Sequence, residues 1–286
     1  MPDIGHPEKR AIMMELPESY MLSRQITKEL VGKIISEVII LQTPHKFCFF
    51  KSDVDTYADQ LEGQTIVGAT FKGGMLEIDT EDTMIVFSDG VTPRYYEDKK
   101  DFPKKHQLAF LFDDDTALFC TIRMYGFIDV CPVGTCKEEY YVSSSTKPNP
   151  MTDGFTYAHF RSLYDGTRRL SAKALLATEQ RIPGLGNGVL QDILWDAGID
   201  PRFKMERASE EDFHALYDST VKMLRKMCAE GGRDTENDIF GNPGGYITQL
   251  SKKSYGEPCM KCGYPIHKTN YMGGTVYFCE KCQKLG

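Results

Sequence analysis

Four cysteines near the C-terminus constrain this chain more than any other feature. They form two pairs, Cys259-Met-Lys-Cys262 and Cys279-Glu-Lys-Cys282, with sixteen residues between the pairs. A C-x2-C pair places two thiolates on one tight turn, and two such pairs supply the tetrahedral S4 ligand set that Zn2+ prefers. Gly273-Gly274 lies between them with apolar and aromatic residues on either side, which predicts a β-hairpin. We therefore expect a four-cysteine zinc module.

The expected Zn2+ is structural rather than catalytic. Sulfur fills all four coordination positions, so none remains for water. A redox-active C-x2-C pair is the main alternative, but the pairs are doubled and no thioredoxin-like βαβ pattern precedes them. An iron–sulfur cluster is a smaller alternative. The other cysteines are scattered along the chain and are expected to be buried, unreactive thiols: Cys48, Cys120, Cys131, Cys136 and Cys228.

Hydrophobic periodicity predicts an α+β architecture with two main domains. A helix is expected over residues 18–30. Short apolar runs rich in β-branched and aromatic residues then predict the strands of an antiparallel β-sandwich or barrel, at residues 34–41, 47–50, 65–71, 75–78, 84–87, 107–112 and 117–123. Helical patterns follow at residues 156–164, 171–180, 189–197 and 210–230.

These patterns also place the expected domain boundaries. The stretch from residue 140 to 154 contains three serines in a row and two prolines, which is typical of a linker. The expected units are an N-terminal extension (1–13), a β-sandwich domain (14–140), a linker (141–154), a helical domain (155–250) and the zinc module (251–286).

Charge and hydropathy limit the partners. The net charge of −7 disfavours a protein that coats nucleic acid indiscriminately. Residues 157–286 nevertheless carry 18 basic against 16 acidic side chains, so any nucleic-acid contact should lean on the C-terminal half. No apolar run approaches the ~20 residues needed to span a bilayer, and the first dozen residues lack the apolar core of an export signal. We expect a cytoplasmic protein with no membrane partner.

A glycine-rich turn at residues 181–192 separates two helical patterns. Pro183, Gly184 and Gly186 favour a tight turn, and Asn187 is suited to cap the following helix. Exposed amides at a helix N-terminus bind phosphate readily, so the segment could hold a DNA or RNA backbone. The alternative is an ordinary capped turn inside a core.

The run IPGLGNGVLQDILWDAGIDPR at residues 182–202 resembles the helix–two-turn–helix (H2TH) signature of the formamidopyrimidine-DNA glycosylase/endonuclease VIII family. Four further segments resemble that family in the same order: 14–18, 147–153, 231–246 and 255–283. The resemblance implies a β-sandwich, a helical H2TH domain and a zinc-finger hairpin that together grip damaged double-stranded DNA. It also implies a monomer, associated with the nucleoid if the source is prokaryotic.

The resemblance implies a base-excision chemistry, but the residue at the nucleophile position differs in this chain. Family members attack the sugar C1′ with the amine of an N-terminal proline, form a Schiff base, and move protons with the next glutamate. Glu15 matches that glutamate and Glu18 matches a second one, but Met14 stands at the proline position. Pro2 is twelve residues away and is not expected to replace it. A surface carboxylate capping a helix is the alternative for Glu15.

Other positions of the family pattern are altered or kept. Gly74 and Gly274 stand where the resemblance places a phosphate-binding lysine and the finger arginine, and Lys72 is the nearest candidate amine. Arg123 and Tyr125 match the wedge that fills the space of a flipped base; an edge-strand Arg and a core Tyr are the alternative. The remaining matches are two phosphate-binding positions, Lys173 and Asn187, and His106, for which a structural role is expected.

Two classes of function follow. The first is a DNA glycosylase, with or without AP lyase activity, that works on oxidised or abasic sites through altered catalytic machinery, with Glu15, Glu18 and Lys72 as candidate catalytic residues. The second is a catalytically inactive protein that binds lesions or structured nucleic acid through the same scaffold.

Overall fold

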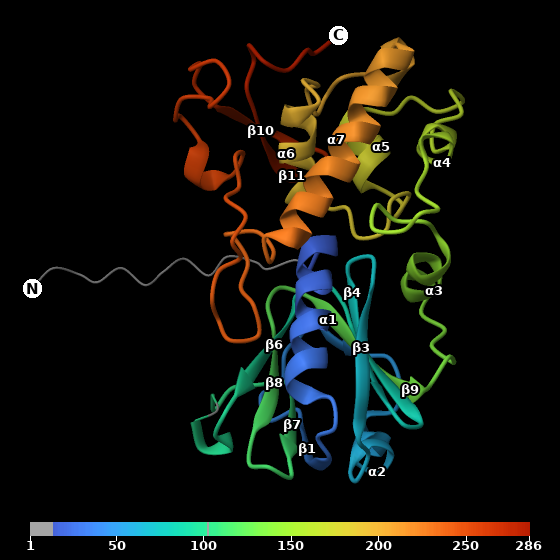
Figure 1. The fold of residues 1–286 in the computed structure, drawn as a ribbon, viewed down its shortest axis with the longest axis vertical. Coiled ribbons are helices and arrows are strands. Elements are labelled where there is room, and N and C mark those ends of the chain that lie inside the picture. Colours follow the sequence, from blue (N-terminus) through green and yellow to red (C-terminus); the bar gives the residue numbers. More distant parts are fainter. Residues whose placement is uncertain (1–13, 102) are drawn as a thin grey trace, which may run out of the picture.

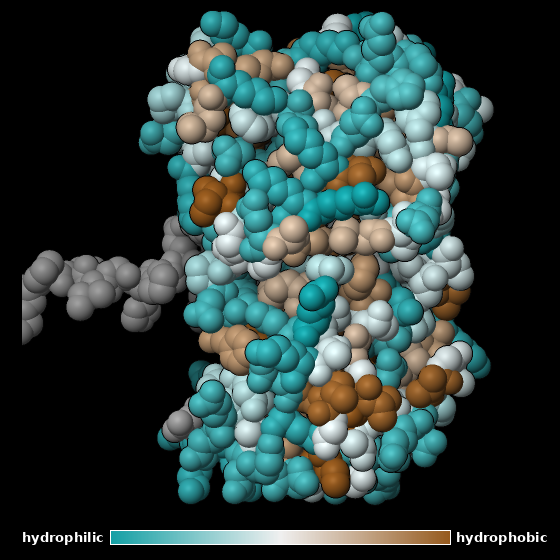
Figure 2. All heavy atoms as spheres, in the orientation of Figure 1, coloured by the Kyte–Doolittle hydropathy of each residue, from teal (hydrophilic) through white to brown (hydrophobic). Residues whose placement is uncertain are grey.

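The computed structural model describes residues 14–101 and 103–286, so the expected extension at residues 1–13 lies outside the described residues. Two halves are stacked along the long axis of the molecule, with β-strands in one and helices in the other (Figure 1). Each half has its own apolar core, one centred on residues such as Phe110 and Ile78 and the other on residues such as Leu190 and Leu224. Hydrophilic side chains cover most of the face shown in Figure 2, with smaller apolar patches among them.

The N-terminal half is a β-sandwich. Its strands are β1 (Ile35–Ile40), β2 (Cys48–Phe50), β3 (Ile66–Lys72), β4 (Met75–Thr80), β5 (Thr83–Phe87), β6 (Val91–Tyr96), β7 (Leu108–Phe112), β8 (Ala117–Ile122) and β9 (Gly126–Pro132). One sheet has the order β1-β7-β8-β6 and the other β2-β9-β5-β4-β3. The predicted sandwich is confirmed, and its paired strands are antiparallel except that β2 runs parallel to β9.

Two helices accompany the sandwich. Helix α1 (Leu16–Leu30) lies along β3 and β4, and the short α2 (Tyr57–Leu61) lies against β1. The apolar face of α1 buries Met21, Leu22, Ile26 and Leu30 in the sandwich core, as the helical spacing of these residues requires. The predicted helix at residues 18–30 is therefore confirmed, and it begins two residues earlier than expected.

The helical half contains α4 (Tyr157–Ser162), α5 (Ala172–Ala177), α6 (Val189–Asp196) and α7 (Glu210–Ala229). These confirm the four helical patterns, although α4 and α5 are shorter than predicted. A further helix, α3 (Glu139–Thr146), occupies the first part of the segment predicted as an irregular linker. The serine run that suggested a linker lies inside this helix, where Ser144 is buried.

The C-terminal hairpin is formed by β10 (His267–Tyr271) and β11 (Gly274–Phe278). It packs against α6 of the helical half. The turn joins Tyr271 to Gly274 in register, and Met272 and Gly273 both have positive φ, as a two-residue hairpin turn requires. The predicted hairpin is confirmed.

Two segments tie the halves together. The N-terminal end of α1 reaches α7, and the loop after α7 descends onto the sandwich (Figure 1). Within that loop the Asp238 carbonyl accepts a hydrogen bond from Arg94 (2.6 Å), and the Asp238 carboxylate accepts one from Gln25 of α1 (3.1 Å). The residues at the start of α1 therefore lie where the halves meet.

Within the described residues, no helix is both long enough and apolar enough to cross a bilayer.

Candidate functional site

Glu15 lies at the junction of the two halves and is buried, with 5% of its surface exposed. Its two carboxylate oxygens accept hydrogen bonds from the backbone N–H groups of Gly188 and Val189, each at 2.8 Å. These amides form the N-terminus of α6, where an anion is stabilised by unpaired N–H groups and by the helix dipole. Burial raises the pKa of the Glu15 carboxyl, although Arg233 and the two amides act in the opposite direction.

This contact corrects two predictions about the glycine turn. The α6 amides expected to face a phosphate are occupied by the Glu15 carboxylate, which is an anion supplied by the chain itself. Asn187 does not cap α6, because the residue that precedes the helix is Gly188 and the Asn187 amide is turned toward the hairpin. The surface position in the alternative for Glu15 is wrong, since the side chain is buried, but Glu15 does occupy the N-cap of α1, in a capping box with Glu18.

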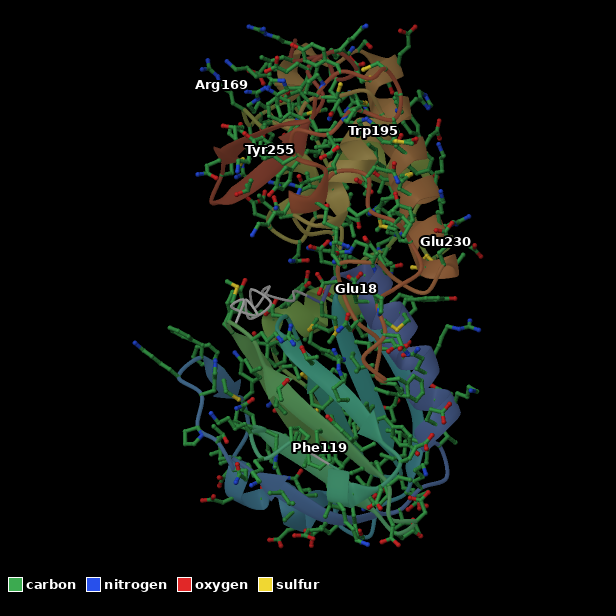
Figure 3. All side chains as sticks on the ribbon, turned by 90° about the vertical axis from the view of Figure 1, so that its left-hand side faces the viewer. Glu18, Phe119, Arg169, Trp195, Glu230 and Tyr255 are labelled. Atoms are coloured by element: carbon green, nitrogen blue, oxygen red, sulfur yellow. The ribbon has the colours of Figure 1, made fainter. Side chains whose placement is uncertain are left out.

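Glu18 forms a buried, bidentate ion pair with Arg233. The Nε and Nη2 atoms of Arg233 donate to the two Glu18 oxygens at 2.9 and 2.7 Å, and both side chains are at most 4% exposed. Glu18 also accepts a hydrogen bond from the Glu15 backbone N–H at 3.2 Å. Burial alone would lower the pKa of Arg233, but Glu18 and Glu15 hold it well above its ordinary value. Figure 3 shows Glu18 at the level where the two halves meet.

Glycines in the turn before α6 make room for this cluster. A Cβ on Gly186 would lie 2.6 Å from Glu15 Oε1, and a Cβ on Gly188 would lie 1.7 Å from Arg233 Nη1. Neither contact is sterically allowed. These two glycines are therefore required because buried side chains approach the backbone here.

Glu236 is a third carboxylate of the same cluster, and it is 8% exposed. Its Oε2 atom is buried without a hydrogen-bond partner among the described residues. Burial raises the pKa of Glu236 to about 8; Arg233 and Arg123 oppose this shift, and Glu18 and Glu15 add to it. Arg233 and Glu236 lie more than 200 residues from Glu15 and Glu18 in the sequence. No local pattern signals their role, and only the fold brings the four together.

Met14 stands at the position where the family resemblance places the proline amine. The Met14 N–H donates to the Asp89 carbonyl at 2.8 Å, and the Met14 side chain is buried. At Gly74, where the resemblance places a lysine, an added Cβ would lie 2.9 Å from Met14 O and 3.2 Å from the Tyr140 hydroxyl. The backbone of residue 14 and Tyr140 thus fill the space that a side chain at position 74 would need.

Lys72 ends β3, and its ammonium lies 3.9 Å from Glu77 Oε1. Glu77 also accepts a hydrogen bond from the Tyr141 hydroxyl of α3. Lys72 therefore forms an ion pair with Glu77, a carboxylate that lies beside α3.

The β8–β9 loop carries Arg123, Met124 and Tyr125, all of which are exposed. Met124 has a positive φ of 65°, which turns the backbone between the two predicted wedge residues. The loop is held by Gly90, whose N–H donates to Tyr125 O and whose carbonyl accepts from Arg123 N–H. Tyr125 is 41% exposed, so a core role for this tyrosine is wrong. His106 is fully buried and packs edge-on against Phe119, in agreement with a structural role.

Lys173 and Asn187 meet at the tip of the hairpin. Lys173 Nζ donates to Tyr271 O at 2.7 Å, and Asn187 Nδ2 donates to Thr275 O at 3.1 Å. A Cβ on Gly274 would lie 3.3 Å from both Lys173 Nζ and Asn187 Oδ1. Burial lowers the pKa of the Lys173 ammonium. The structure therefore brings together the two predicted phosphate-binding residues and Gly274, the position at which the family resemblance places the finger arginine.

The four cysteines of the predicted zinc module converge. Cys259, Cys262, Cys279 and Cys282 place their sulfurs within 4.8 Å of one another, including pairs at 3.8 and 3.5 Å. Zn–S bonds of about 2.3 Å in a tetrahedron put neighbouring sulfurs about 3.8 Å apart, whereas a disulfide needs about 2.05 Å. The donor set therefore fits Zn2+. Trp195 of α6 fixes the module, since its indole N–H points to Cys259 Sγ at 3.3 Å.

Direct contacts link these elements into one continuous arrangement. Asn187 contacts the hairpin tip, and the next residue, Gly188, donates a hydrogen bond to Glu15. On the other side, Met14 donates to Asp89, and the residue after Asp89 is Gly90, which holds the wedge loop. The hairpin tip, the buried carboxylates and the exposed wedge loop are thus positioned relative to one another.

The architecture is a β-sandwich joined to a helical half that carries a four-cysteine β-hairpin. The solved structure of Lactococcus lactis Fpg in complex with abasic-site-containing DNA superposes with a TM-score of 0.81 at 24% identity, over 94% of this chain and 99% of that one. MutM (Fpg) from Thermus thermophilus gives 0.79 at 22% identity, over 94% and 98% of the chains. These likenesses establish the fold.

Sequence comparison finds relatives of the same kind. The formamidopyrimidine-DNA glycosylase N-terminal domain matches residues 13–128. The formamidopyrimidine-DNA glycosylase of Enterococcus faecalis is 28% identical over 286 residues, covering 96% of this chain and 98% of that protein. The one from Bacillus licheniformis is 29% identical over 278 residues, covering 95% and 100%. The chain is therefore similar over nearly its whole length to formamidopyrimidine-DNA glycosylases, and its residues 13–128 match the N-terminal domain of that family.

Proposed function

We propose that this protein is a DNA glycosylase of the base-excision repair type that binds damaged duplex DNA and releases an oxidised base without an amine nucleophile at residue 14. One observation carries the proposal: the buried Glu15 carboxylate lies between the hairpin tip and the wedge loop. It bonds to Gly188, whose neighbour Asn187 contacts the tip, and the preceding residue Met14 bonds to Asp89, next to the glycine that holds the loop. A relative of this fold was solved with abasic-site-containing DNA, which supports damaged DNA as the ligand.

The proposed grip on DNA uses the helical half and the hairpin. Lys173 has three N–H donors and spends one on Tyr271 O, so the others can contact a phosphate beside the tip. Asn187 would hold the hairpin backbone in place and contribute to the same phosphate site. Such contacts position the duplex without reading its sequence.

The proposed wedge is the exposed pair Arg123 and Tyr125. An aromatic ring inserted into the stack replaces the contacts of a flipped base, and a damaged base costs less to flip than an intact pair. Arg123 lies close enough to Glu236 to affect its pKa, so the wedge and the carboxylate cluster would act on the same nucleotide.

The proposed chemistry is hydrolytic. A water oxygen would bond to the sugar C1′ as the C1′–N bond breaks; Glu15 would accept the proton of the water, and the base would leave with the bonding electron pair and take up a proton. Because burial raises the pKa of Glu15, its carboxylate is a stronger proton acceptor than an ordinary glutamate. Glu18 would hold Arg233 beside it as a positioning residue. The Met14 nitrogen is an amide, so it cannot form a Schiff base.

A catalytically inactive lesion-binding protein is the second candidate. The observations that favour it are the peptide nitrogen at residue 14 and the glycines at positions 74 and 274, which replace three groups that the family resemblance assigns to active members. In this case the carboxylate cluster would only join the two halves.

One experiment separates these functions. Duplexes that carry 8-oxoguanine, thymine glycol or an abasic site are incubated with the protein, with and without borohydride. We expect base release without a trapped adduct, and loss of base release in Glu15→Gln with DNA binding retained. Glu29→Gln changes a partly exposed glutamate at the other end of the same helix; it is the matched control and should behave as wild type.

The other outcomes overturn defined parts of the proposal. A trapped adduct would overturn the amine-free mechanism, and its disappearance in Lys72→Ala would make Lys72 the nucleophile. Binding of damaged duplexes without base release would establish the second candidate.

A further inference from the structure

A second cysteine cluster lies in the sandwich, far along the chain from the zinc module. Cys131 and Cys136, expected to be scattered, unreactive thiols, lie side by side with Asp129. One ligand atom from each of the three falls within 4.8 Å of the other two. We propose that Asp129, Cys131 and Cys136 form a second metal site, which binds a thiophilic divalent ion of the Zn2+ type.

The spacing of the ligand atoms fits such an ion. Cys136 Sγ lies 3.5 Å from Asp129 Oδ2. Zn–S bonds of about 2.3 Å and Zn–O bonds of about 2.0 Å in a tetrahedron put sulfur and oxygen about 3.5 Å apart. The four sulfurs of the zinc module likewise lie within 4.8 Å of one another. Three protein ligands leave the fourth position to water, which distinguishes this site from the closed S4 site.

Local structure explains why the three groups meet. Asp129 and Cys131 alternate on one face of β9, as residues i and i+2 of a strand must. A tight turn follows, in which Thr135 N–H donates to Pro132 O at 3.0 Å and Gly134 has a positive φ of 75°. The chain folds back and places Cys136 over Asp129. The cluster is therefore set by strand register and a turn rather than by chance surface proximity.

Charge favours a cation here. Asp129 is 7% exposed, and among the described residues the Cys136 thiol is the side-chain donor to its carboxylate. A second buried carboxylate, Glu77, lies two strands away on the same face, because Val86 pairs with both residues. Two cations near this face are paired with other carboxylates: Lys72 is 3.9 Å from Glu77, and Lys51, above the Phe127 ring, is 2.8 Å from Glu138. A buried carboxylate without a counter-charge is costly.

A disulfide is the competing chemistry for two adjacent cysteines. It would need no carboxylate and would leave Asp129 buried against uncharged sulfur. A bound ion instead accounts for all three side chains. On binding, the two thiols release their protons to water, and two thiolates with one carboxylate surround the ion with a net charge of −1.

The site would fix the chain segment that crosses from the sandwich to the helical half. Cys136 lies three residues before α3. Tyr140 of α3 reaches the space beside Gly74, and Tyr141 bonds to Glu77. An ion that holds Cys136 to β9 would therefore fix the start of α3 against the sheet.

The test is the zinc content of the full-length protein after equilibration with Zn2+ and removal of unbound metal. Wild type should hold two Zn2+ per chain, and Cys131→Ser/Cys136→Ser should hold one. Cys48→Ser/Cys228→Ser removes two cysteines outside both clusters and should still hold two. One Zn2+ in wild type, or two in Cys131→Ser/Cys136→Ser, would overturn the proposal.

Asp129→Asn keeps the shape of the side chain and removes only its charge, so it serves if the double variant does not fold. It should lose the second Zn2+ to a competing chelator while keeping the first.

Replacement by Co2+ gives an independent readout, because the thiolate-to-metal absorption of wild type should report six coordinating sulfurs and that of Cys131→Ser/Cys136→Ser four. Equal absorption in the two proteins, or a wild-type mass two hydrogens short from a Cys131–Cys136 disulfide, would refute the site.

Discussion

The carboxylate cluster and the hairpin-tip cluster use polar groups in opposite ways. At the junction of the halves, Glu15, Glu18 and Arg233 are almost fully buried, and their charged atoms satisfy one another or backbone amides. At the tip, Lys173 is also buried, with 4% of its surface exposed, but Lys173 and Asn187 donate to hairpin carbonyls rather than to charged partners, and Met272 and Gly273 beside them are exposed. The first cluster pairs opposite charges with one another, whereas the lysine of the second donates to a backbone carbonyl, which carries no counter-charge.

The carboxylate cluster is therefore suited to stabilise the fold, and the hairpin-tip cluster is suited to bind a ligand. A buried, paired charge is costly to disrupt because its partner is left without a counter-charge. Removing a lysine that bonds to a carbonyl leaves no buried charge unpaired, and the charge of the lysine is needed only when an anion binds. Substitutions at the junction should therefore change stability, and substitutions at the tip should change DNA affinity.

The largest effect is expected from Arg233→Met. The methionine keeps most of the volume and leaves Glu18 and Glu15 buried without a cation, which should lower the free energy of unfolding by about 3–5 kcal/mol. Denaturant unfolding measures it. Lys253→Ala removes a cation from a half-exposed pair with Asp234 and should cost less than about 1 kcal/mol. Equal losses in the two variants would contradict the distinction between the clusters.

The next effect is a pH dependence from Glu236. Its folded-state pKa of about 8 lies above the ordinary value of 4.5, so the protonated carboxyl is favoured in the folded state. Its contribution to stability is complete below pH 4.5 and is lost as the pH rises through about 8. Glu236→Gln should flatten the free energy of unfolding over this range, measured by denaturant unfolding at several pH values. The exposed Glu257→Gln should keep the wild-type slope; a wild-type slope in Glu236→Gln would refute the assignment.

A smaller effect is expected at the hairpin tip. Lys173→Ala should weaken duplex binding by about tenfold for damaged and undamaged DNA alike, and should reduce the salt dependence by about one ion. Fluorescence anisotropy at several salt concentrations measures both. Lys222→Ala removes a cation paired with Asp196 on the helical half and should leave both quantities unchanged. An unchanged salt slope in Lys173→Ala would exclude Lys173 from the phosphate site.

The smallest effect is a gain from Gly274→Arg. The backbone at this position has no positive φ, and the closest obstacles to a Cβ are the ends of the Lys173 and Asn187 side chains at 3.3 Å. The added guanidinium should tighten duplex binding about threefold and raise the salt dependence by about one ion. Thr275→Arg places the same charge on the other face of β11 and should give no gain at this site. Equal gains would mean that charge alone, rather than its position, matters.

The sequence predicted features that depend on local spacing. The two cysteine pairs, the hairpin between them and the apolar face of α1 each follow from residues close together in the chain. Strands β6 and β9 were missed because Pro93, Arg94, Gly126 and Asp129 interrupt their apolar patterns. Helix α3 was missed because its serine run is typical of linkers.

The rest of the site depends on contacts that no spacing reveals. The α6 N-terminus was expected to bind phosphate, but Glu15, from more than 170 residues earlier, occupies it. Arg233 and Glu236 carry no motif and gain their roles only by meeting Glu15 and Glu18. The Cys131–Cys136 pair was missed because four residues separate the cysteines and the third ligand, Asp129, lies on the preceding strand segment.

The affinity of the wild-type protein for a duplex with one abasic site, relative to the same duplex undamaged, tests the central claim most directly. A missing base removes part of the cost of unstacking, which is a few kcal/mol, and leaves a gap for the Arg123–Tyr125 loop to fill. The account predicts binding to the abasic duplex that is tighter by about tenfold or more at constant salt. Equal affinity for the two duplexes would contradict it.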